Sequence, residues 1–390
     1  MKNIKPKPHV LLINQFCGFL CEDLANGLAK EFSTLDLICG NPNKANFINE
    51  VKIKKFIAYN RSSLISRFTS WTIFSIQCFF YGLWNKSNVW VLVSNPPFIP
   101  LIMGWLANLK KISFFIVVYD LYPESLQQTK FISADSFLFK KWQNLNRLIF
   151  KKSKGIITLS TSMKLAIEKY LPNSDFTKVI VIPNWYDSKV NTTFSTPYGE
   201  NPYQNKWENK LIILYSGNFG FTHDLSSLIE AANLLRINKY IHFVLAGDGA
   251  QKNLLIKMAN EYKLSNLEFL PYQSSENFSY LLKKSDIGVV SLSSGAESNS
   301  IPSKTYTAMA LGLCILGISE SKSSLEQLIH SYQMGINIPP NNPYLLSQTI
   351  LELNQNREKL VKYKIASKKA SKNFTNRNVE NYVSFIRKLA

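Results

Sequence analysis

The stretch from residue 211 to residue 235 holds the combination of residue types that most directly predicts chemistry. A continuous apolar run at residues 211–215 is typical of a buried parallel strand. Gly217 and Gly220 follow and predict a turn with open backbone N–H groups, and apolar residues at helical spacing come next. This order favours anion binding, because unpaired amides and the helix dipole would point outward together. The alternative is an ordinary strand-to-helix turn without a ligand.

A second junction of this kind spans residues 301–312, with the sequence IPSKTYTAMALG. Pro302 suits the first helical position, because its missing N–H group would have no partner there. Lys304 then falls in the first turn, where a cation opposes the helix dipole. An anion bound at the start of this helix would resolve the conflict, so Lys304 is a candidate phosphate ligand. The alternative is a solvated surface lysine.

A third junction, AGDGAQK, spans residues 246–252. Gly247 and Gly249 permit close approach of the backbone to a ligand, and Lys252 could reach a phosphate. By itself this sequence is that of an ordinary strand-to-helix loop. His223, a lone histidine at the start of a predicted helix, is a further candidate for a phosphate contact, with a capping or surface role as its alternative.

Two acidic residues follow a very apolar run in the first half of the chain. Asp120 comes directly after FFIVVY at residues 114–119, and Glu124 follows four residues later. Ligands of doubly wound sheets bind beyond the carboxyl ends of the strands, so we expect these carboxylates at a functional sheet edge. Acidic residues in such places also cap helices or bind backbone turns, which is the alternative role.

The elements that would position these residues alternate along the chain. Short apolar or β-branched runs alternate with helical patterns in both halves, which predicts an α/β protein with doubly wound parallel sheets. In the first half, strands are expected at residues 10–13, 35–39, 89–93, 114–119, 156–159 and 179–182, with helices near 20–32, 61–84, 98–109, 136–150 and 162–170. In the second half, strands are expected at residues 211–215, 242–246, 267–270, 287–291, 314–317 and 335–338, with helices near 225–235, 251–262, 275–284, 303–311 and 323–331.

The length of 390 residues favours two domains, since a single hydrophobic core rarely grows so large. Between the two alternating halves lies a polar, irregular stretch rich in Asn, Thr and Pro, which is the best candidate for a linker. We therefore predict domains at residues 1–186 and 210–372, a linker at 187–209 and a final helical segment at 373–390.

The charge balance favours an anionic partner. The chain has 45 Lys and Arg against 26 Asp and Glu residues, for a formal net charge of +19. A nucleotide, a nucleic acid or an acidic membrane surface would each fit this charge. We expect no nucleic acid, because no RNA- or DNA-binding motif is present and the basic C-terminal region has little aromatic interleaving.

Cysteine usage and hydropathy bear on the compartment. The five cysteines are scattered, without a CxxC pair or a Cys/His cluster of zinc spacing, which indicates reduced thiols in a cytoplasmic protein. Residues 61–84 form a long apolar stretch, but its Thr, Ser and Gln residues argue against a membrane-spanning helix. We favour a buried helix of the first domain there, and a helix lying in a membrane interface is the alternative.

Nine short motifs occur in collinear order between Ser94 and Gly312. They are SNPP at residues 94–97, YDLYPES at 119–125, ITLSTSM at 157–163, VIPNW at 181–185, YSGNFG at 215–220, AGDGA at 246–250, LPYQ at 270–273, SDIGVVSL at 285–292 and PSKTYTAMALG at 302–312. Together they resemble the glycosyltransferase family 4 enzymes that assemble bacterial surface polysaccharides, in the branch of colanic-acid and O-antigen transferases such as the L-fucosamine transferases. The first ninety residues match only in general outline.

The resemblance implies a GT-B fold, in which two Rossmann-like domains face each other across a cleft and the last helix crosses back onto the first domain. The C-terminal domain would bind a nucleotide-diphosphate sugar and the N-terminal domain the acceptor. The implied catalytic residues are Asp120 and Glu124 on the acceptor side and Glu297 near the donor sugar. The implied or candidate donor-binding residues are Gly217, Asn218, Gly220, His223, Gly247, Gly249, Lys252, Pro271, Tyr272, Ser303, Lys304 and Thr307.

Some positions depart from the family pattern. The paired glutamates of many members, eight residues apart, fall at Asn299 and Thr307, and Glu297 is slightly out of register. Where other members have a catalytic His before the aspartate of the acceptor strand, this chain has Tyr119. These departures motivate an alternative function, that of a nucleotide-binding GT-B scaffold that has lost turnover in polysaccharide assembly.

We therefore predict a retaining, metal-independent glycosyltransferase that needs no cofactor. It would move a sugar, N-acetylated by resemblance, from a UDP-linked donor to a lipid-linked saccharide acceptor in cell-surface polysaccharide biosynthesis. Amide dipoles and lysines would stabilise the departing diphosphate in place of a metal ion. The basic surface would hold the cytoplasmic protein peripherally on the anionic inner face of the plasma membrane.

Overall fold

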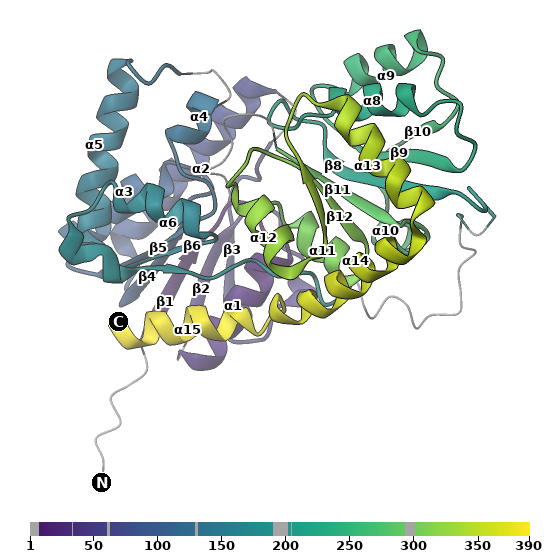
Figure 1. The fold of residues 1–390 in the computed structure, drawn as a ribbon. Helices are drawn as coiled ribbons and strands as arrows, with labels where there is room; N and C mark the ends of the chain where they lie inside the picture. Colours follow the sequence, from purple (N-terminus) through teal and green to yellow (C-terminus); the bar gives the residue numbers. More distant parts are fainter. Residues whose placement is uncertain are drawn as a thin grey trace. The chain divides into compact units, whose positions relative to one another are not determined.

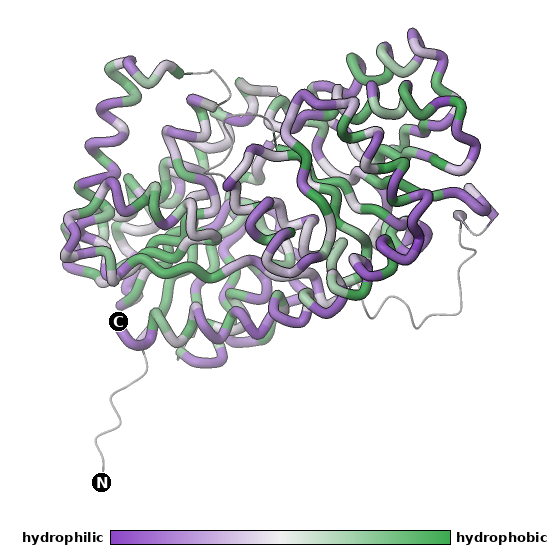
Figure 2. Tube along the Cα trace, viewed as in Figure 1, coloured by the Kyte–Doolittle hydropathy of each residue, from purple (hydrophilic) through white to green (hydrophobic). Residues whose placement is uncertain are grey.

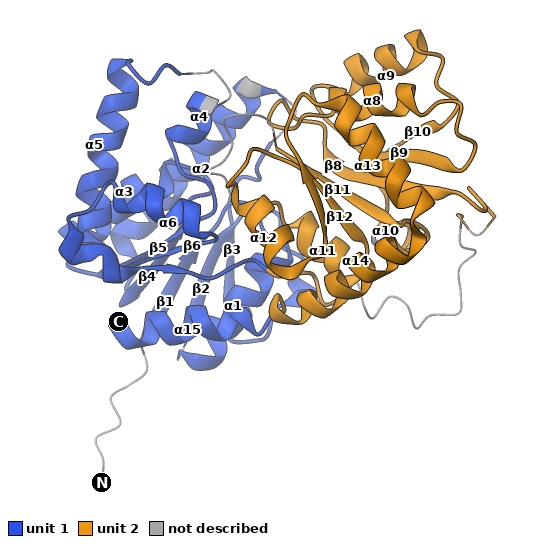
Figure 3. Cartoon of the chain, viewed as in Figure 1, with its two compact units in different colours: residues 1–184, 376–390 blue, residues 185–375 orange. Residues whose placement is uncertain are grey.

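A computed structural model of the chain describes residues 8–32, 34–60, 63–128, 132–189, 202–203, 205–292 and 301–390. The chain divides into two compact units (Figure 3): unit 1 is Met1–Asn184 with Asn376–Ala390, and unit 2 is Trp185–Thr375. Each unit contains one parallel β-sheet with α-helices packed against it (Figure 1). The predicted α/β class with doubly wound parallel sheets is confirmed.

Unit 1 has a seven-stranded sheet with the strand order β3-β2-β1-β4-β5-β6-β7, and all its pairs are parallel. Its strands are β1 His9–Ile13, β2 Thr34–Cys39, β3 Val51–Lys55, β4 Val89–Val93, β5 Ser113–Val118, β6 Gly155–Thr158 and β7 Val179–Val181. All of these strands except β3 and β7 are almost wholly buried, because parallel sheets are covered on both faces. Figure 2 shows the resulting hydrophobic interior of this unit.

One strand of this sheet is absent from the prediction. β3 has the sequence VKIKK and lies at the edge of the sheet, paired with β2 only. An edge strand has one exposed side, and its lysines keep that open backbone from pairing with another chain. The strands were predicted from runs of apolar or β-branched residues. β3 has three lysines in five residues, so it was not recognised as a strand.

Two helices cover one face of the unit 1 sheet. They are α1 Phe19–Glu31 and the C-terminal α15 Asn378–Leu389, which pack on each other and on the sheet (Figure 1). The contact is close, because a Cβ at Gly27 would overlap Val379, and the Phe385 ring packs edge-on against Phe115 of β5. The last helix of the chain is thus a structural part of unit 1.

The opposite face is covered by α2 Leu64–Trp84, α3 Ile99–Leu109, α5 Phe137–Lys152 and α6 Thr161–Glu168, whose apolar residues share one core with the strands. The short α4 Glu124–Gln128 precedes α5. Trp71, Phe74 and Cys78 of α2 are buried in this arrangement, but a row of apolar side chains along the other side of the same helix is exposed. The favoured prediction of a buried helix at residues 61–84 is therefore wrong for half of its surface.

No helix within the described ranges is long and apolar enough to cross a membrane. The five cysteines are free thiols, and four of them are buried, with Cys17 partly exposed.

Unit 2 has a six-stranded sheet with the order β10-β9-β8-β11-β12-β13, again with all pairs parallel. Its strands are β8 Leu211–Asn218, β9 Ile241–Asp248, β10 Leu267–Leu270, β11 Ile287–Ser291, β12 Cys314–Ile318 and β13 Gly335–Ile338. Its helices are α8 Ser226–Leu234, α9 Lys252–Glu261, α10 Ser275–Lys284, α11 Lys304–Ala310, α12 Ser324–Tyr332, α13 Pro343–Gln355 and α14 Arg357–Ala370. All six strands were predicted, three of them with the observed bounds.

The predicted linker, residues 187–209, belongs to unit 2 and lies largely outside the described residues. Its described C-terminal part is attached to the sheet of this unit. Trp207 donates a hydrogen bond to Glu268 of β10 and stacks on His242 of β9, and Tyr203 donates to Gln273.

Candidate functional site

The carboxyl edge of the unit 2 sheet brings the predicted glycines together. β8 and β9 run in register to their ends, where Gly217 pairs with Gly247 and Asn218 with Asp248. Gly217, Gly247 and Gly249 have φ values of +130°, +147° and +151°, a region that side chains other than glycine rarely adopt. Gly217 was predicted in a turn, but it is a strand residue. Its unusual φ bends the strand end without ending the ladder.

Lys304, the first residue of α11, lies beside these strand ends. Its ammonium is 3.6 Å from the centre of the Tyr215 ring and 3.8 Å from the place that a Cβ at Gly217 would occupy. No Asp or Glu of the described chain lies within 4.0 Å of this ammonium, whereas the neighbouring Lys252 pairs with Asp248 at 3.4 Å. Desolvation lowers the pKa of Lys304 to about 7. A cation held this way, without a carboxylate, next to an open glycine backbone is suited to an anionic ligand.

His223 belongs to the same cluster. Its Nδ1 lies 2.6 Å from the carbonyl oxygen of Ser291, so Nδ1 carries the proton and donates to that carbonyl. Desolvation and the nearby Lys304 charge lower the pKa of His223 to about 4, so the ring is neutral at pH 7. A neutral imidazole that donates through Nδ1 offers Nε2 as an acceptor. This chemistry fits a ligand hydroxyl better than the phosphate contact that was predicted.

Gln251 fixes the loop that carries these groups, and sequence reasoning missed this role. Its side-chain amide donates to the carbonyl oxygens of Gly220 and His223, at 2.5 and 3.1 Å. Tyr215, also missed, donates through its hydroxyl to the carbonyl oxygen of Asn218 at 2.7 Å. The partners of Gln251 lie 31 and 28 residues away in the sequence, so local spacing does not indicate them. The glycines of AGDGAQ predicted a close approach of the backbone, but the sequence did not indicate that Gln251 holds the loop.

We expect Gln251→Leu to weaken the binding of an anion at this loop without unfolding unit 2. The variant removes two hydrogen bonds that hold the glycine loop, each contributing about 1 kcal/mol, so affinity should fall by up to roughly 30-fold. Isothermal titration with inorganic pyrophosphate measures the effect. The exposed Gln327→Leu is a matched control, because its side chain bonds only locally to the Lys322 carbonyl. Equal affinities for both variants would show that the loop does not depend on Gln251.

The remaining donor-side predictions lie at the same edge of unit 2, with different degrees of exposure. Pro271 and Tyr272 follow β10 and are exposed, and the Tyr272 hydroxyl lies 3.5 Å from the Asp248 carbonyl oxygen. Ser303 is exposed just before α11, and Thr307 is buried one turn into that helix. Glu297 falls outside the described residues.

The two predicted carboxylates of unit 1 have different surroundings. Asp120 follows β5 at the carboxyl edge of the sheet, and its backbone N–H donates to the Ser94 hydroxyl. Desolvation raises the pKa of Asp120, and the Arg67 charge opposes this shift. Glu124 instead accepts hydrogen bonds from Gln143 and Tyr170, which anchor it within unit 1. Of the two, Asp120 is the exposed carboxylate, and Glu124 is partly buried.

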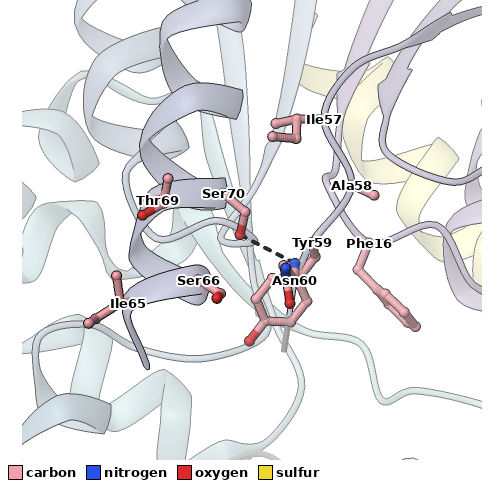
Figure 4. A pocket seen from close by; sticks show the side chains of 9 residues that line it. All are labelled: Phe16, Ile57, Ala58, Tyr59, Asn60, Ile65, Ser66, Thr69 and Ser70. Carbon is pink, nitrogen blue, oxygen red and sulfur yellow. Dashed lines mark hydrogen bonds between the residues drawn. The ribbon is translucent and has the colours of Figure 1, made fainter. Parts of the chain in front are cut away.

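A hollow of about 760 Å³ opens at this edge of unit 1 (Figure 4). It lies between the loop after β3, the first turns of α2 and Phe16, which follows β1. Figure 4 shows the Tyr59 ring beside Asn60, whose N–H donates to Ser70 at 3.3 Å. Tyr59 stacks on Trp71 and accepts a hydrogen bond from the Arg67 guanidinium at 2.9 Å. An aromatic platform with hydroxyl and amide groups around it is suited to a sugar, whose faces are apolar and whose edges are polar.

Within the ranges that the structure describes, no group of three or more His, Cys, Asp or Glu side chains could hold a metal ion. The chemical groups at the unit 2 edge are backbone amides, a desolvated ammonium and a neutral imidazole. Such groups can bind a diphosphate and stabilise negative charge that develops on it.

Comparison with known proteins agrees with this chemistry. Residues 200–370 match the family described as glycosyl transferases group 1. WbjE of Pseudomonas aeruginosa, named as a glycosyltransferase, is 23% identical over 346 residues, which cover 86% of this chain and 85% of WbjE. WcaI of Escherichia coli strain K12, named as a glycosyl transferase of colanic acid biosynthesis, is 34% identical over 182 residues, which cover 46% of this chain and 44% of WcaI.

A solved structure of HepE from Anabaena, in complex with UDP and glucose, has a TM-score of 0.71 to this chain at 12% identity. The match covers 97% of this chain and 98% of HepE. At that identity it shows the fold alone, and the predicted GT-B fold is confirmed. The family match and the two relatives support a glycosyltransferase that acts in the biosynthesis of bacterial surface polysaccharide.

Proposed function

We propose that the protein is a retaining, metal-independent glycosyltransferase that moves a sugar from a UDP-linked donor to a lipid-linked saccharide. The observation that carries the proposal is the Lys304 ammonium, which lies beside Gly217 over the Tyr215 ring, with no carboxylate within 4.0 Å in the described chain. The UDP bound to HepE supports a uridine nucleotide as the donor. An N-acetylated sugar and membership of the family 4 branch rest on the sequence resemblance.

The residues of unit 2 have separable roles in this proposal. The backbone around Gly217 receives the diphosphate, since the place of its missing Cβ has only the Lys304 side chain nearby, at 3.8 Å. Lys304 neutralises the charge that develops on the diphosphate as the glycosidic bond to the donor breaks. His223 accepts a hydrogen bond from a hydroxyl of the donor sugar through Nε2. Pro271 and Tyr272 border the base.

Unit 1 supplies the acceptor side in this proposal. The Tyr59 platform receives the terminal sugar of the acceptor, and Asp120 accepts a hydrogen bond from its attacking hydroxyl. Orientation of the two substrates then provides much of the rate, as in other reactions whose reactants are fixed in near-attack geometry. The acceptor is carried on a membrane lipid, so the protein works peripherally at the cytoplasmic face of the membrane.

A thermal-shift titration with UDP, GDP, ADP and their sugar conjugates tests the donor. A ligand that binds only the native state raises the midpoint with its concentration relative to Kd. We expect UDP and a UDP-N-acetylhexosamine to raise it and ADP to leave it unchanged. No shift with any nucleotide would count against the proposal.

A transfer assay with a lipid-linked saccharide then distinguishes an active glycosyltransferase from a scaffold that binds nucleotide without turnover. Release of UDP together with a product whose anomeric configuration matches the donor supports the retaining enzyme. Inversion of the configuration contradicts the retaining mechanism. Nucleotide binding without any transfer would favour the alternative of a GT-B scaffold that has lost turnover.

A further inference from the structure

The outward side of α2 is unusual for a helix in contact with water. From Ile65 to Trp84, every exposed side chain is uncharged, and most are large and apolar. Ile76 and Phe80, one turn apart, are 49% and 54% exposed, and Trp84 is 74% exposed. The opposite side of α2 is already packed in the core of unit 1. A helix that is apolar on both sides needs a second apolar environment.

Exposed apolar residues also occur on α3, which packs on α2, and on α5, which packs on α3. α3 packs on α2 so closely that a Cβ at Gly82 would overlap Met103, and Phe79 of α2 stacks on Trp105 of α3 with ring centres 6.5 Å apart. Trp105 and Leu109 of α3 are both more than half exposed. α5 packs against α3 and adds exposed apolar residues, of which Phe137, Leu138 and Leu148 are the most exposed.

The charge on these three helices has one sign. α5 carries five basic residues, Lys140, Lys141, Arg147, Lys151 and Lys152, and α2 carries Arg67. The sequences of α2, α3 and α5 contain no Asp or Glu. Asp135, which precedes α5, lies 4.0 Å from Lys140, so the positive charge here is in excess rather than alone. A surface that combines large apolar side chains with excess positive charge complements a surface with apolar chains and negative head groups.

A basic hollow of about 560 Å³ lies at the C-terminal end of α2. Trp84, Lys86, Lys110 and Lys111 are among the residues that line it. Lys110 donates to three carbonyl oxygens at the end of α2, at 2.7, 3.0 and 2.9 Å, so it stabilises the helix end. Lys86 and Lys111 remain to attract the phosphate of a lipid head group next to an indole ring.

We propose that the exposed side of α2, with the adjoining exposed residues of α3 and α5, docks on an anionic lipid bilayer. α2 has 21 residues and is therefore about 30 Å long, so it lies along the membrane surface over most of one side of unit 1. Trp84 and Trp105 sit at the level of the head groups, the place that tryptophan prefers.

Docking of α2 would bring the hollow of unit 1 close to a lipid-linked acceptor saccharide. This step rests on the proposed function. Ile65 and Thr69 belong both to the exposed row of α2 and to the lining of the hollow beside Tyr59 (Figure 4). With α2 on the bilayer, the hollow opens at head-group level. An acceptor saccharide can enter it while its lipid chain stays in the membrane.

Vesicle co-sedimentation tests the docking directly. The full chain is mixed with vesicles of phosphatidylcholine alone or of phosphatidylcholine with phosphatidylglycerol. We expect it to sediment with the anionic vesicles only. The double variant Ile76→Ser/Phe80→Ser should bind them roughly 100-fold more weakly, from the lost burial of two large apolar side chains. Lys140→Glu/Lys141→Glu should weaken binding at least about tenfold.

Controls separate this proposal from its alternatives and from the proposed function. Ile237→Ser removes an isoleucine of unit 2 that is 87% exposed, and it should leave vesicle binding unchanged. All these variants should bind UDP like the wild type. Vesicle binding therefore tests the docking proposal, and UDP binding tests the proposed function independently. A wild-type chain that stays in solution with both kinds of vesicle overturns the docking. So does an α2 double variant that loses a dimer rather than vesicle binding, because a second copy would then cover this surface.

Discussion

Lys304→Met is expected to lower the affinity for UDP by roughly 10- to 100-fold while leaving the unliganded protein at least as stable as before. The first effect follows because a charge-assisted hydrogen bond to an anion contributes about 1.5–3 kcal/mol. The second follows because the ammonium is desolvated and has no carboxylate within 4.0 Å in the described chain, so its removal relieves a cost. Titration calorimetry and thermal melts of the same two samples measure both effects.

The pH dependence of binding has a defined sign. Desolvation lowers the pKa of Lys304 from its ordinary value of 10.5 to about 7, so between these pH values the unfolded chain binds this proton and the folded chain loses it. Stability should therefore rise with pH between about 7 and 10, and this rise should be absent in Lys304→Met. Nucleotide affinity should fall as pH rises through the same window, because the bound diphosphate requires the charged ammonium.

A matched lysine shows whether these effects belong to position 304. Lys257 of α9 is exposed and pairs with Glu261, four residues on. Lys257→Met should change neither the affinity for UDP nor its pH dependence by more than about twofold, as for most surface pairs. If Lys304→Met bound UDP as tightly as Lys257→Met, the proposed role of Lys304 in holding the diphosphate would be lost.

The sequence predicted the fold well where one physical signal dominates. β11 is a buried central strand with a continuous apolar run, and it was predicted with its observed bounds. β10 and β13 are partly buried edge strands without lysines, and they were also predicted with their observed bounds. β3 was missed because three of its five residues are lysines, which suit an edge strand but interrupt the apolar run. The two sides of α2 could not be told apart, because apolar residues occur all round it and only the packing decides which side is covered.

The residues of the candidate site could be predicted from the sequence, but the hydrogen bonds between them could not. The glycines, Lys304 and His223 could be named from strand-to-helix junctions, and the structure brings them to one edge of unit 2. The contacts that define their chemistry join distant positions, such as His223 with Ser291 and Gln251 with Gly220. Local spacing carries no information on those pairings, so the neutral state of His223 and the function of Gln251 emerged only from the three-dimensional structure.

Gly247→Ala is expected to destabilise unit 2 by about 4 kcal/mol or more. Gly247 has a φ of +147°, and a Cβ there would lie 1.9 Å from the carbonyl oxygen of Gly217 and 2.9 Å from its carbonyl carbon. These are backbone atoms of the paired strand, so no side chain can move aside. The strand ends would have to separate, which removes the surface that is proposed to receive the diphosphate.

Hydrogen-exchange mass spectrometry can assign this loss to the right unit. Peptides from β8 and β9 should lose protection in Gly247→Ala, while peptides from β1 and β4 should keep theirs, because each unit has its own core. Gly220→Ala is the matched control. Its Cβ would overlap the side-chain amide of Asn218, at 2.6 Å, which can rotate away, and it would make an ordinary contact with His223 at 3.8 Å. Its cost should be about 1 kcal/mol. Equal protection of β8 in the two variants would mean that the close contact between Gly217 and Gly247 does not hold these strand ends together.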